Sequence, residues 1–205
     1  MTASGKNKIP KKLHIVWVGH KPCPRELILS WRNNHPDWDF YLWNEQNIVG
    51  FECQELINKC LTKHNYPAVA DIVRYEVLYK YGGVAVDADS ECLKPIDELL
   101  NIDEDCFACY QSETRRPGLI SPQMGAIKGN KLMRAMIDAL KERKEVKTAW
   151  MDTGNLLLTC MIYETRHPIK IYPSYYFIPQ NHDEQDYTKD KNVYAVQKWF
   201  TTNRK

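Results

Sequence analysis

Residues 70–89 (ADIVRYEVLYKYGGVAVDAD) constrain the fold of this 205-residue chain most strongly. A helical pattern ends there at Gly82–Gly83, and glycine supplies the positive φ that helix C-termini favour. Residues 84–86 (VAV) are apolar and mostly β-branched, which is typical of a buried strand. The pattern predicts a helix, a tight turn and a central strand in succession, with Asp87 and Asp89 where the strand leaves the sheet.

The charged residues of the predicted helix fall on two sides. At 3.6 residues per turn, Glu76 and Lys80 form a favourable i,i+4 pair, and we expect this pair to face water. Asp71 and Arg74 point in roughly the opposite direction. They either bridge each other or belong to a functional site, because the rest of their helix face is apolar.

Asp87 and Asp89 are two residues apart, so both carboxylates project to the same face of a regular strand. Mg²⁺ and Mn²⁺ prefer oxygen ligands, keep some of their water and commonly bind one or two carboxylates together with substrate phosphates. Taken alone, Asp-x-Asp fits either such a metal site or a solvated turn.

Short apolar segments alternate with helical patterns along the chain, which favours an α/β fold with a mostly parallel, Rossmann-like sheet flanked by helices. The predicted strands are 13–18, 39–43, 84–87, 106–110, 124–127, 169–172 and 193–196, and the predicted helices are 25–34, 47–61, 69–81, 131–144 and 153–164. We expect 111–123 to be a loop, which either closes over a ligand or only connects two elements. Because 43% of the residues are hydrophobic, we treat 1–205 as a single domain.

Composition excludes several classes of partner. The net charge is +2 without a basic tract, which does not favour nucleic-acid binding. No apolar run approaches the roughly 18 residues of a membrane span, and residues 1–12 lack a signal-peptide core, so we expect no transmembrane segment and a cytoplasmic location. No Gly-x-Gly-x-x-Gly follows the first predicted strand and no Gly-Lys-Ser/Thr loop occurs. Since both of these nucleotide-binding motifs are absent, an Asp-x-Asp pair that binds a metal is the remaining way to hold the diphosphate of a nucleotide.

The seven cysteines are an odd number without a secretory signal, which indicates reduced thiols rather than a disulfide framework. Cys106 and Cys109 form a single Cys-x-x-Cys pair, and no second pair follows that would complete a zinc ribbon. We therefore expect one inward-facing and one outward-facing thiol on a strand.

Motifs of different kinds surround residues 70–89. They are IPKKLHIVWVG at 9–19, SW at 30–31, HPDW at 35–38, LWNE at 42–45 and LKPID at 93–97. In this order they resemble the glycosyltransferases that carry a sugar-binding region containing a DXD motif, which include yeast-type mannosyltransferases and are related to clostridial toxin glucosyltransferase domains. The resemblance covers about residues 9–199 and weakens after about 129. It implies a GT-A type fold.

The resemblance also implies a donor-binding set and a metal-binding set. The donor set is Val16, Trp17, Asp71, Arg74, Asp87, Asp89, Gly154 and Asn155, and the metal set is Asp87, Asp89 and Gln197. Trp17 would lie near the nucleotide base, although an indole in an apolar strand is also a common core residue. Asp71 and Arg74 would contact the donor sugar and its phosphate.

The C-terminal part departs from the family pattern. Residues 152–155 (DTGN) stand where the family often has Thr-Gly-Pro, and Gln197 stands where a metal ligand is expected. An amide oxygen is a weaker Mn²⁺ ligand than imidazole, so either the aspartates, donor and water hold the metal or the chain is the N-terminal catalytic domain of a longer protein. Asp152 precedes a glycine turn and is either a contact to acceptor or donor hydroxyls or a helix N-cap.

These patterns predict a metal-dependent glycosyltransferase that moves a hexose-like sugar from a UDP- or GDP-linked donor to a hydroxyl of a glycan or another acceptor. Asp87, Asp89 and Asp152 are the catalytic candidates, and Mn²⁺ or Mg²⁺ would neutralise the leaving diphosphate. The family relation implies retention of anomeric configuration. No acidic residue can be identified from the sequence as the base that an inverting reaction needs.

Two alternatives remain at the level of sequence. Residues 84–89 also resemble the nucleophile strand of haloacid-dehalogenase-type phosphatases, but Glu91 stands where that fold needs a small hydroxyl residue. A non-catalytic module that binds a sugar nucleotide or a glycan is the second alternative.

Overall fold

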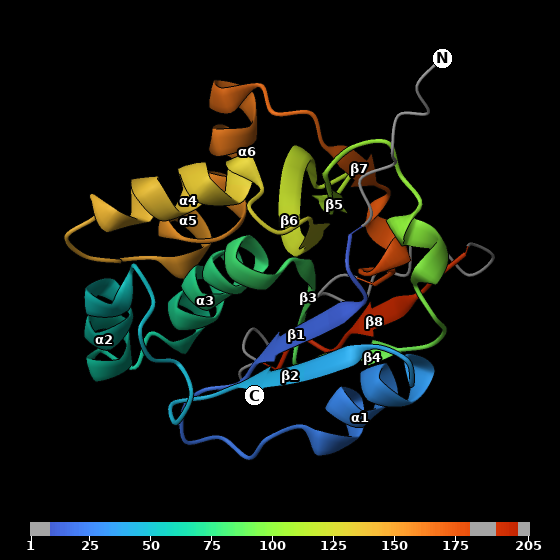
Figure 1. Cartoon of the computed structure of the whole chain (residues 1–205), viewed down its shortest axis with the longest axis horizontal. Coiled ribbons are helices and arrows are strands. Elements are labelled where there is room, and N and C mark those ends of the chain that lie inside the picture. Colours follow the sequence, from blue (N-terminus) through green and yellow to red (C-terminus); the bar gives the residue numbers. More distant parts are fainter. Residues whose placement is uncertain (1–8, 181–191, 201–205) are drawn as a thin grey trace.

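A six-stranded mixed sheet lies between two sets of helices in the computed structural model, which describes residues 9–180 and 192–200 (Figure 1). The strands are β1 (Lys12–Val16), β2 (Asp39–Trp43), β3 (Gly83–Asp87), β5 (Cys106–Ser112), β6 (Arg116–Ala126) and β7 (Lys170–Tyr172). Their order is β2-β1-β3-β6-β5-β7, and of the pairs between them only those made by β6 are antiparallel. The predicted α/β class with a mostly parallel sheet is confirmed.

The helices cover both faces of this sheet and build two hydrophobic cores. They are α1 (Arg25–Asn34), α2 (Gln54–Thr62), α3 (Tyr66–Tyr81), α4 (Lys131–Lys141), α5 (Ala149–Asp152) and α6 (Asn155–Thr165), with short 3₁₀ turns η1 (Asp97–Leu100) and η2 (Ser174–Tyr176). Helices α2, α3, α4 and α6 pack on one core and α1 with η1 on the other. Along β5, Cys106 faces the first core and Cys109 the second. Both thiols are buried, so the expectation of one outward-facing thiol was wrong, because no face of this strand is left to solvent.

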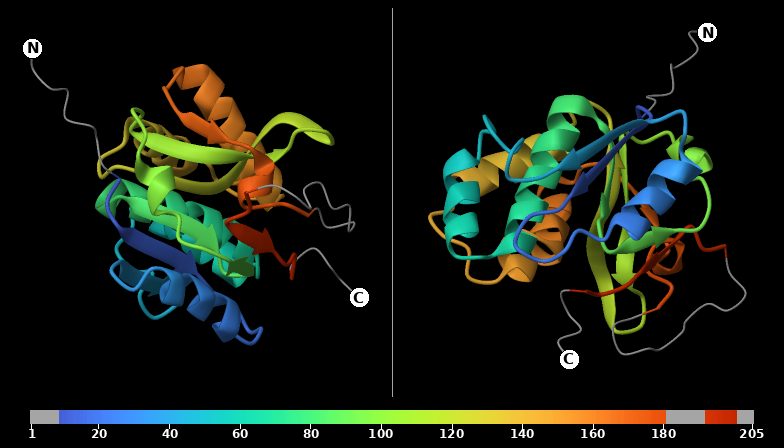
Figure 2. Two further views of the ribbon diagram at one scale, coloured as in Figure 1. Left: turned by 90° about the vertical axis from the view of Figure 1, so that its right-hand side faces the viewer. Right: turned by 90° about the horizontal axis from the view of Figure 1, so that it is seen from below.

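Two predicted segments differ from the structure. Helix α2 begins at Gln54 rather than at residue 47, because Gly50 adopts a positive φ of 73° that a helix cannot contain. Residues 111–123 are not a loop: β5 and β6 form a long hairpin, and Gly118 adopts its φ of 81° inside β6. The turn-like composition of 115–118 concealed the strand. In Figure 2 the hairpin tip extends beyond the rest of the sheet.

A second, two-stranded sheet brings the C-terminal part of the chain to the end of β3. Strand β4 (Ser90–Cys92) pairs antiparallel with β8 (Ala195–Gln197), and this register sets Ser90 opposite Gln197. The indole of Trp31 on α1 donates its N–H to the backbone oxygen of Ser90 at 3.0 Å, which holds β4 against the helix. Because Ser90 follows Asp89 directly, Gln197 lies beside the second carboxylate of the Asp-x-Asp sequence.

The predicted helix–glycine–strand unit is present. The Gly82 N–H donates to the Leu78 oxygen at 2.9 Å and closes α3, with φ of 65° at Gly82 and 116° at Gly83. His14 on β1 donates from Nε2 to the Gly82 oxygen at 2.9 Å, and its Nδ1 accepts the Trp43 indole N–H at 3.2 Å. Burial lowers the pKa of His14 to about 4, so the ring is neutral and bridges three elements at neutral pH.

The expected solvent-facing pair on α3 does not form. Glu76 is 5% exposed, and its Oε1 accepts the backbone N–H of Cys53 at 2.7 Å, just before α2. Lys80 is exposed and lies over the Tyr81 ring at 5.3 Å from its centroid. Helix α3 is buried on nearly all sides between the sheet and α2 and α4, so the i,i+4 rule, which describes an exposed helix surface, does not apply here.

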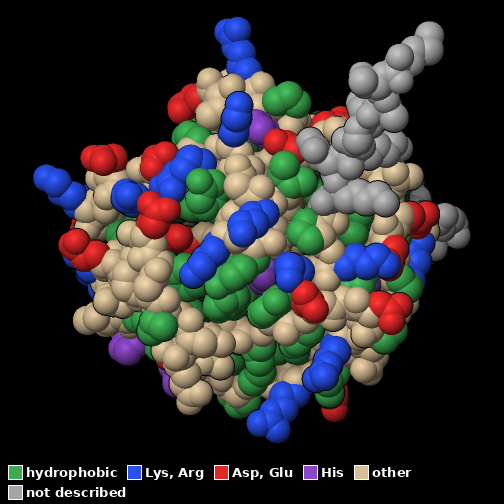
Figure 3. All heavy atoms as spheres, in the orientation of Figure 1, with side chains coloured by type: hydrophobic (Ala, Val, Ile, Leu, Met, Phe, Trp, Pro, Cys, Tyr) green, Lys and Arg blue, Asp and Glu red, His purple; other side chains and the backbone are tan. Residues whose placement is uncertain are grey.

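The surface carries no single-sign charge field on the face in Figure 3, where Lys and Arg are interspersed with Asp and Glu. None of the helices in the described part of the chain combines the length and the apolarity needed to cross a membrane.

Gly83→Ala should destabilise the protein by about 3 kcal/mol or more, because φ is 116° and a Cβ would lie 2.5 Å from the backbone oxygen of Lys12. Gly50→Ala is the matched control: φ is 73°, but nothing lies within 4 Å of the added Cβ, so only the backbone cost of about 1 kcal/mol remains. Urea unfolding of both variants measures the difference, and equal losses would contradict the packing of Gly83 on β1.

Candidate functional site

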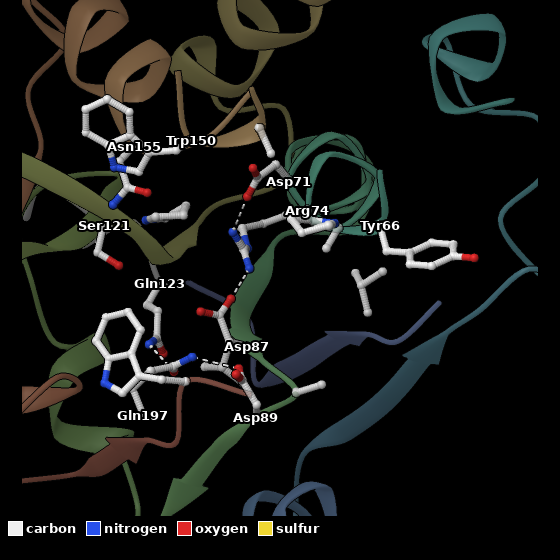
Figure 4. A pocket seen from close by; sticks show the side chains of 18 of the residues that line it. Tyr66, Asp71, Arg74, Asp87, Asp89, Ser121, Gln123, Trp150, Asn155 and Gln197 are labelled. Atoms are coloured by element: carbon white, nitrogen blue, oxygen red, sulfur yellow. Dashed lines mark hydrogen bonds and ion pairs between the residues drawn. The ribbon is translucent and has the colours of Figure 1, made fainter. Parts of the chain in front are cut away.

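A cavity of about 970 Å³ opens where β1 and β3 end, between α3 and the β5–β6 hairpin (Figure 4). Ligands of open α/β sheets bind outside the carboxyl ends of the strands, which is where this cavity lies. Of the residues predicted as donor or metal contacts, those that line it are Val16, Trp17, Asp71, Arg74, Asp87, Asp89, Asn155 and Gln197. The structure thus brings together residues spread over most of the sequence.

Arg74 is the centre of the charged part of the cavity. Its side chain is 4% exposed and lies between two carboxylates, donating from Nη1 to Asp71 Oδ1 at 3.0 Å and from Nη2 to Asp87 Oδ1. Asp87 keeps 31% of its side chain exposed. The planar guanidinium therefore connects α3 to the end of β3 and fixes Asp87 at the cavity wall.

Asp71 is enclosed by the turn that precedes α6. Its Oδ2 accepts the Thr153 hydroxyl at 2.9 Å, and a Cβ at Gly154 would come within 2.9 Å of the same oxygen. Burial raises the pKa of Asp71 to about 6, against the opposing effects of Arg74 and Thr153. Gly154, predicted as a donor contact, thus leaves room for this carboxylate and is not among the residues that line the cavity.

Asp89 lies in the turn after β3 rather than in a regular strand. Its Oδ1 accepts the Gln197 amide N–H at 2.6 Å, and its Oδ2 accepts the Phe200 backbone N–H at 2.9 Å. Burial, together with the nearby charge of Asp87, raises the pKa of Asp89 to about 6. Gln197 therefore presents its amide nitrogen to Asp89, not the oxygen that a metal ligand requires.

The interior of the site fits a divalent cation. Asp71 and Asp87 pair with the buried guanidinium of Arg74, and Asp89 adds a third carboxylate close to Asp87, which leaves an excess of negative charge. A cation held by Asp87 and Asp89 would offset both the burial of Asp89 and its repulsion by Asp87. The two carboxylates are the hard oxygen ligands that Mg²⁺ and Mn²⁺ prefer.

The other end of the cavity is aromatic. Trp17 follows β1 and is half-buried, with its indole N–H bonded to the Lys21 oxygen at 3.2 Å. Tyr66 at the start of α3 lines the same region and packs on Gly19, where a Cβ would approach its ring within 2.6 Å. A flat base has two aromatic surfaces available here.

Asp152 is not brought to the cavity. One carboxylate oxygen accepts from Arg143 Nη1 at 2.8 Å, and the other accepts the backbone N–H groups of Lys147 and Thr148 at 2.8 and 2.9 Å. These contacts hold the loop before α5 and lower the pKa of Asp152, against the opposing effect of burial. Asp152 is not among the residues that line the cavity, so its contact to substrate hydroxyls stays a prediction, and it lies at the end of its helix rather than at an N-cap.

Sequence reasoning missed the polar residues of the hairpin. Ser121 and Gln123 on β6 and Gln111 on β5 line the cavity, and Gln111 accepts the Asn155 amide N–H at 2.7 Å. Trp150 on α5 lines it as well and stacks on Arg116, 4.7 Å from its ring centroid. Gln111, Ser121 and Gln123 lie in the stretch 111–123 that had been expected to be a loop, and Trp150 lies between two predicted helices, so no periodicity pointed to them.

Another group of residues in the described chain could hold a metal. Ligand atoms of Asp105, Cys106 and His167 lie within 4.8 Å of one another, at the opposite end of β5 from the cavity. His167 Nε2 and Asp105 Oδ1 are 2.7 Å apart and bond directly. Burial and the charge of Asp105 raise the pKa of the Cys106 thiol far above its usual range, which keeps it protonated.

Comparison with known proteins identifies the relatives of this chain. Residues 24–107 match the family described as glycosyltransferase sugar-binding region containing DXD motif. This segment runs from α1 into β5 and contains Asp71, Arg74, Asp87 and Asp89. The chain is a relative of the DXD glycosyltransferases. The resemblance predicted from the sequence is confirmed.

Yeast proteins are among these relatives. Inositol phosphoceramide mannosyltransferase 1 of Schizosaccharomyces pombe is 36% identical over 102 residues, 46% of this chain and 32% of the relative. Inositol phosphoceramide mannosyltransferase 2 of the same yeast is 25% identical over 207 residues, 93% of this chain and 57% of the relative. The chain therefore spans between about a third and just over half of the length of these relatives.

Solved structures of toxin domains share the fold. The PaToxG glycosyltransferase superposes with a TM-score of 0.64 at 16% identity, over 77% of this chain and 70% of that one. The ligand-free glycosyltransferase domain of the YGT toxin gives 0.60 at 10% identity, over 81% and 80%. The fold is the GT-A type, as predicted.

Arg74→Met should cost about 3–5 kcal/mol of stability, because it leaves Asp71 and Asp87 buried or half-buried without their cation. Arg134→Met is the matched control, since Arg134 also bridges two carboxylates, Glu52 and Asp138, but its side chain is 28% exposed. We expect the control to lose at most about 1 kcal/mol. Urea unfolding compares the two, and similar losses would contradict a buried ion chain at Arg74.

Asp89→Asn should gain stability relative to the wild type as the pH rises. The pKa of Asp89 is raised from 3.8 to about 6 in the folded protein, so the folded state binds this proton more tightly than the unfolded state does. The proton therefore adds to the free energy of unfolding below about pH 4, and this contribution is lost as the pH rises from about 4 to 6. The asparagine cannot titrate and does not share this loss. Urea unfolding of both proteins at pH 4 and pH 7 with a chelator present tests this, and a difference that does not change with pH would contradict it.

Proposed function

We propose that the chain is a metal-dependent glycosyltransferase that moves a hexose-like sugar from a nucleoside diphosphate donor to an acceptor hydroxyl. The observation that carries the proposal is the pair Asp87 and Asp89 at the C-terminal end of β3, with Asp87 held by the buried Arg74. The pair lies between an aromatic end and a polar end of one cavity. This arrangement supports binding of a base, a diphosphate and a sugar in that order.

Each part of the cavity has a role in the proposal. Trp17 and Tyr66 stack on the base, and Asp87 and Asp89 hold Mn²⁺ or Mg²⁺ against the diphosphate. The metal supplies charge neutralisation for the leaving diphosphate. Arg74 orients Asp87 through their ion pair, and Asp71 and Asn155 face the sugar at the side of α3 and α6 (Figure 4).

The names of related proteins narrow the choice of nucleotide base and sugar in the donor. The yeast relatives are named as mannosyltransferases, and one solved toxin glycosyltransferase domain of the same fold is described as bound to UDP. A donor panel therefore begins with GDP- and UDP-linked hexoses, mannose included. The acceptor is a hydroxyl on a glycan or another molecule.

Retention of anomeric configuration is part of the proposal. The carboxylates that line the cavity within the described residues are Asp71, Asp87 and Asp89. Asp71 and Asp87 are bound to Arg74, and Asp89 accepts hydrogen bonds through both oxygens. None of them is placed as a base for an incoming hydroxyl, which an inverting reaction needs.

The experiment is calorimetric titration of the donor panel with and without Mn²⁺, followed by a donor hydrolysis assay. We expect saturable, metal-dependent binding of one donor and slow release of its nucleoside diphosphate. Asp89→Ala should lower hydrolysis by at least about 100-fold, because it removes a metal ligand. Asp37→Ala is the matched control, since Asp37 is exposed between α1 and β2.

Three outcomes separate the candidate functions. Binding with hydrolysis that needs Asp89 supports the transferase. Binding without turnover of any donor favours the non-catalytic module. No binding of any donor, together with release of phosphate from phosphomonoesters, would favour the phosphatase, although Glu91 is paired with Lys198 on the β4–β8 sheet, where that chemistry needs a hydroxyl.

A further inference from the structure

Gln123 on β6 carries an oxygen without a partner among the described residues. The side chain is 1% exposed and lines the cavity, its Nε2 donates to Gln197 Oε1 at 3.1 Å, and its Oε1 is buried with no donor within hydrogen-bond reach. Buried acceptors in folded proteins are nearly always partnered, because an unmet one costs free energy. Because Gln123 also lines the cavity, this buried acceptor is a candidate contact for a ligand bound there.

The direction of this amide is fixed by its neighbours. An ionised carboxylate only accepts, so Gln197 must turn its N–H toward Asp89, where the N···O distance is 2.6 Å. Its Oε1 then faces Gln123, which must turn its own N–H toward Gln197. These two hydrogen bonds therefore leave Gln123 Oε1, and not its nitrogen, without a partner among the described residues.

Gln123 shares its side of the cavity with two uncharged polar residues. Ser121 lies two residues before it on β6, and Asn155 lies close by at the start of α6, whereas Asp71, Arg74 and Asp87 form the opposite wall (Figure 4). A cation is attracted to the carboxylate wall. A neutral group with an O–H to donate fits the amide and hydroxyl wall, and sugar hydroxyls are such groups.

We propose that Gln123 is a specificity-determining residue whose Oε1 accepts a hydrogen bond from one hydroxyl of the donor sugar, with Gln197 as the positioning residue that orients it. The inference rests on the proposed function and names a contact within the same site. Gln197 then has a different role from the predicted metal ligation. Its amide bonds both Asp89 and Gln123 and so fixes the direction of the Gln123 amide.

The first test needs no variant. Calorimetry with Mn²⁺ compares the wild-type protein's affinity for the accepted nucleotide sugar with its affinity for the set of monodeoxy analogues of that sugar. One analogue should bind about 10-fold more weakly, which is the loss of one hydrogen bond to a buried acceptor. If every monodeoxy analogue binds as tightly as the parent donor, the proposal is overturned.

The second test assigns that hydroxyl to Gln123. Gln123→Met keeps the size of the side chain but removes the acceptor, so it should bind the nucleotide sugar about 10-fold more weakly and the matching nucleoside diphosphate with unchanged affinity. It should also no longer distinguish the parent donor from the sensitive monodeoxy analogue. Gln54→Met on α2, outside the cavity, is the matched control and should keep the wild-type affinities.

The outcomes separate this proposal from the proposed function. If the wild type binds a nucleotide sugar and Gln123→Met binds it equally well with the same discrimination, Gln123 has no role in specificity and only this inference fails. If Gln123→Met weakens Mn²⁺ and nucleoside diphosphate binding instead, the amide serves the metal and the hydroxyl assignment fails. If the wild type binds no nucleotide sugar, the proposed function fails first.

Discussion

The ion chain Asp71–Arg74–Asp87 is the interaction on which the site depends. A guanidinium with 4% of its side chain exposed could not be tolerated without compensation, and two carboxylates from different elements supply it. The chain joins the middle of α3 to the end of β3, so the helix fixes the first carboxylate of the Asp-x-Asp sequence. A third carboxylate, Asp89, gives the site more negative than positive charge. This excess favours binding of a divalent cation and, without a cation, disfavours the ionised form of Asp89.

This ion chain requires α3 to meet β3 in one geometry. Gly82 and Gly83 allow the chain to reverse with positive φ and let β3 approach β1 closely, and the neutral ring of His14 ties the turn to β1 and β2. The β4–β8 pair adds the remaining constraint by setting Gln197 against Asp89. The positive φ angles of Gly82 and Gly83 thus help to bring Arg74 on α3 and Asp87 on β3 together at the cavity.

Much of the fold could be predicted from the sequence because its signals are local. The bounds of α1 and β2 match the structure residue for residue, since each is a short segment with clear limits. The Asp-x-Asp pair, Asp71, Arg74 and Trp17 were found through motif order, and all of them line the cavity. The hairpin residues Ser121 and Gln123, the contacts that occupy Asp152 and the burial of Glu76 depend on long-range packing, which no periodicity within the segment encodes.

The most direct test of the central claim is the position of the metal. A crystal grown with the accepted nucleoside diphosphate and Mn²⁺, measured at the manganese absorption edge, should show an anomalous peak about 2.1 Å from oxygens of Asp87 and Asp89. That result would place the cation and the diphosphate at the end of β3, where Arg74 fixes the carboxylate. A peak at Asp105, Cys106 and His167, or one that touches neither Asp87 nor Asp89, would contradict the account.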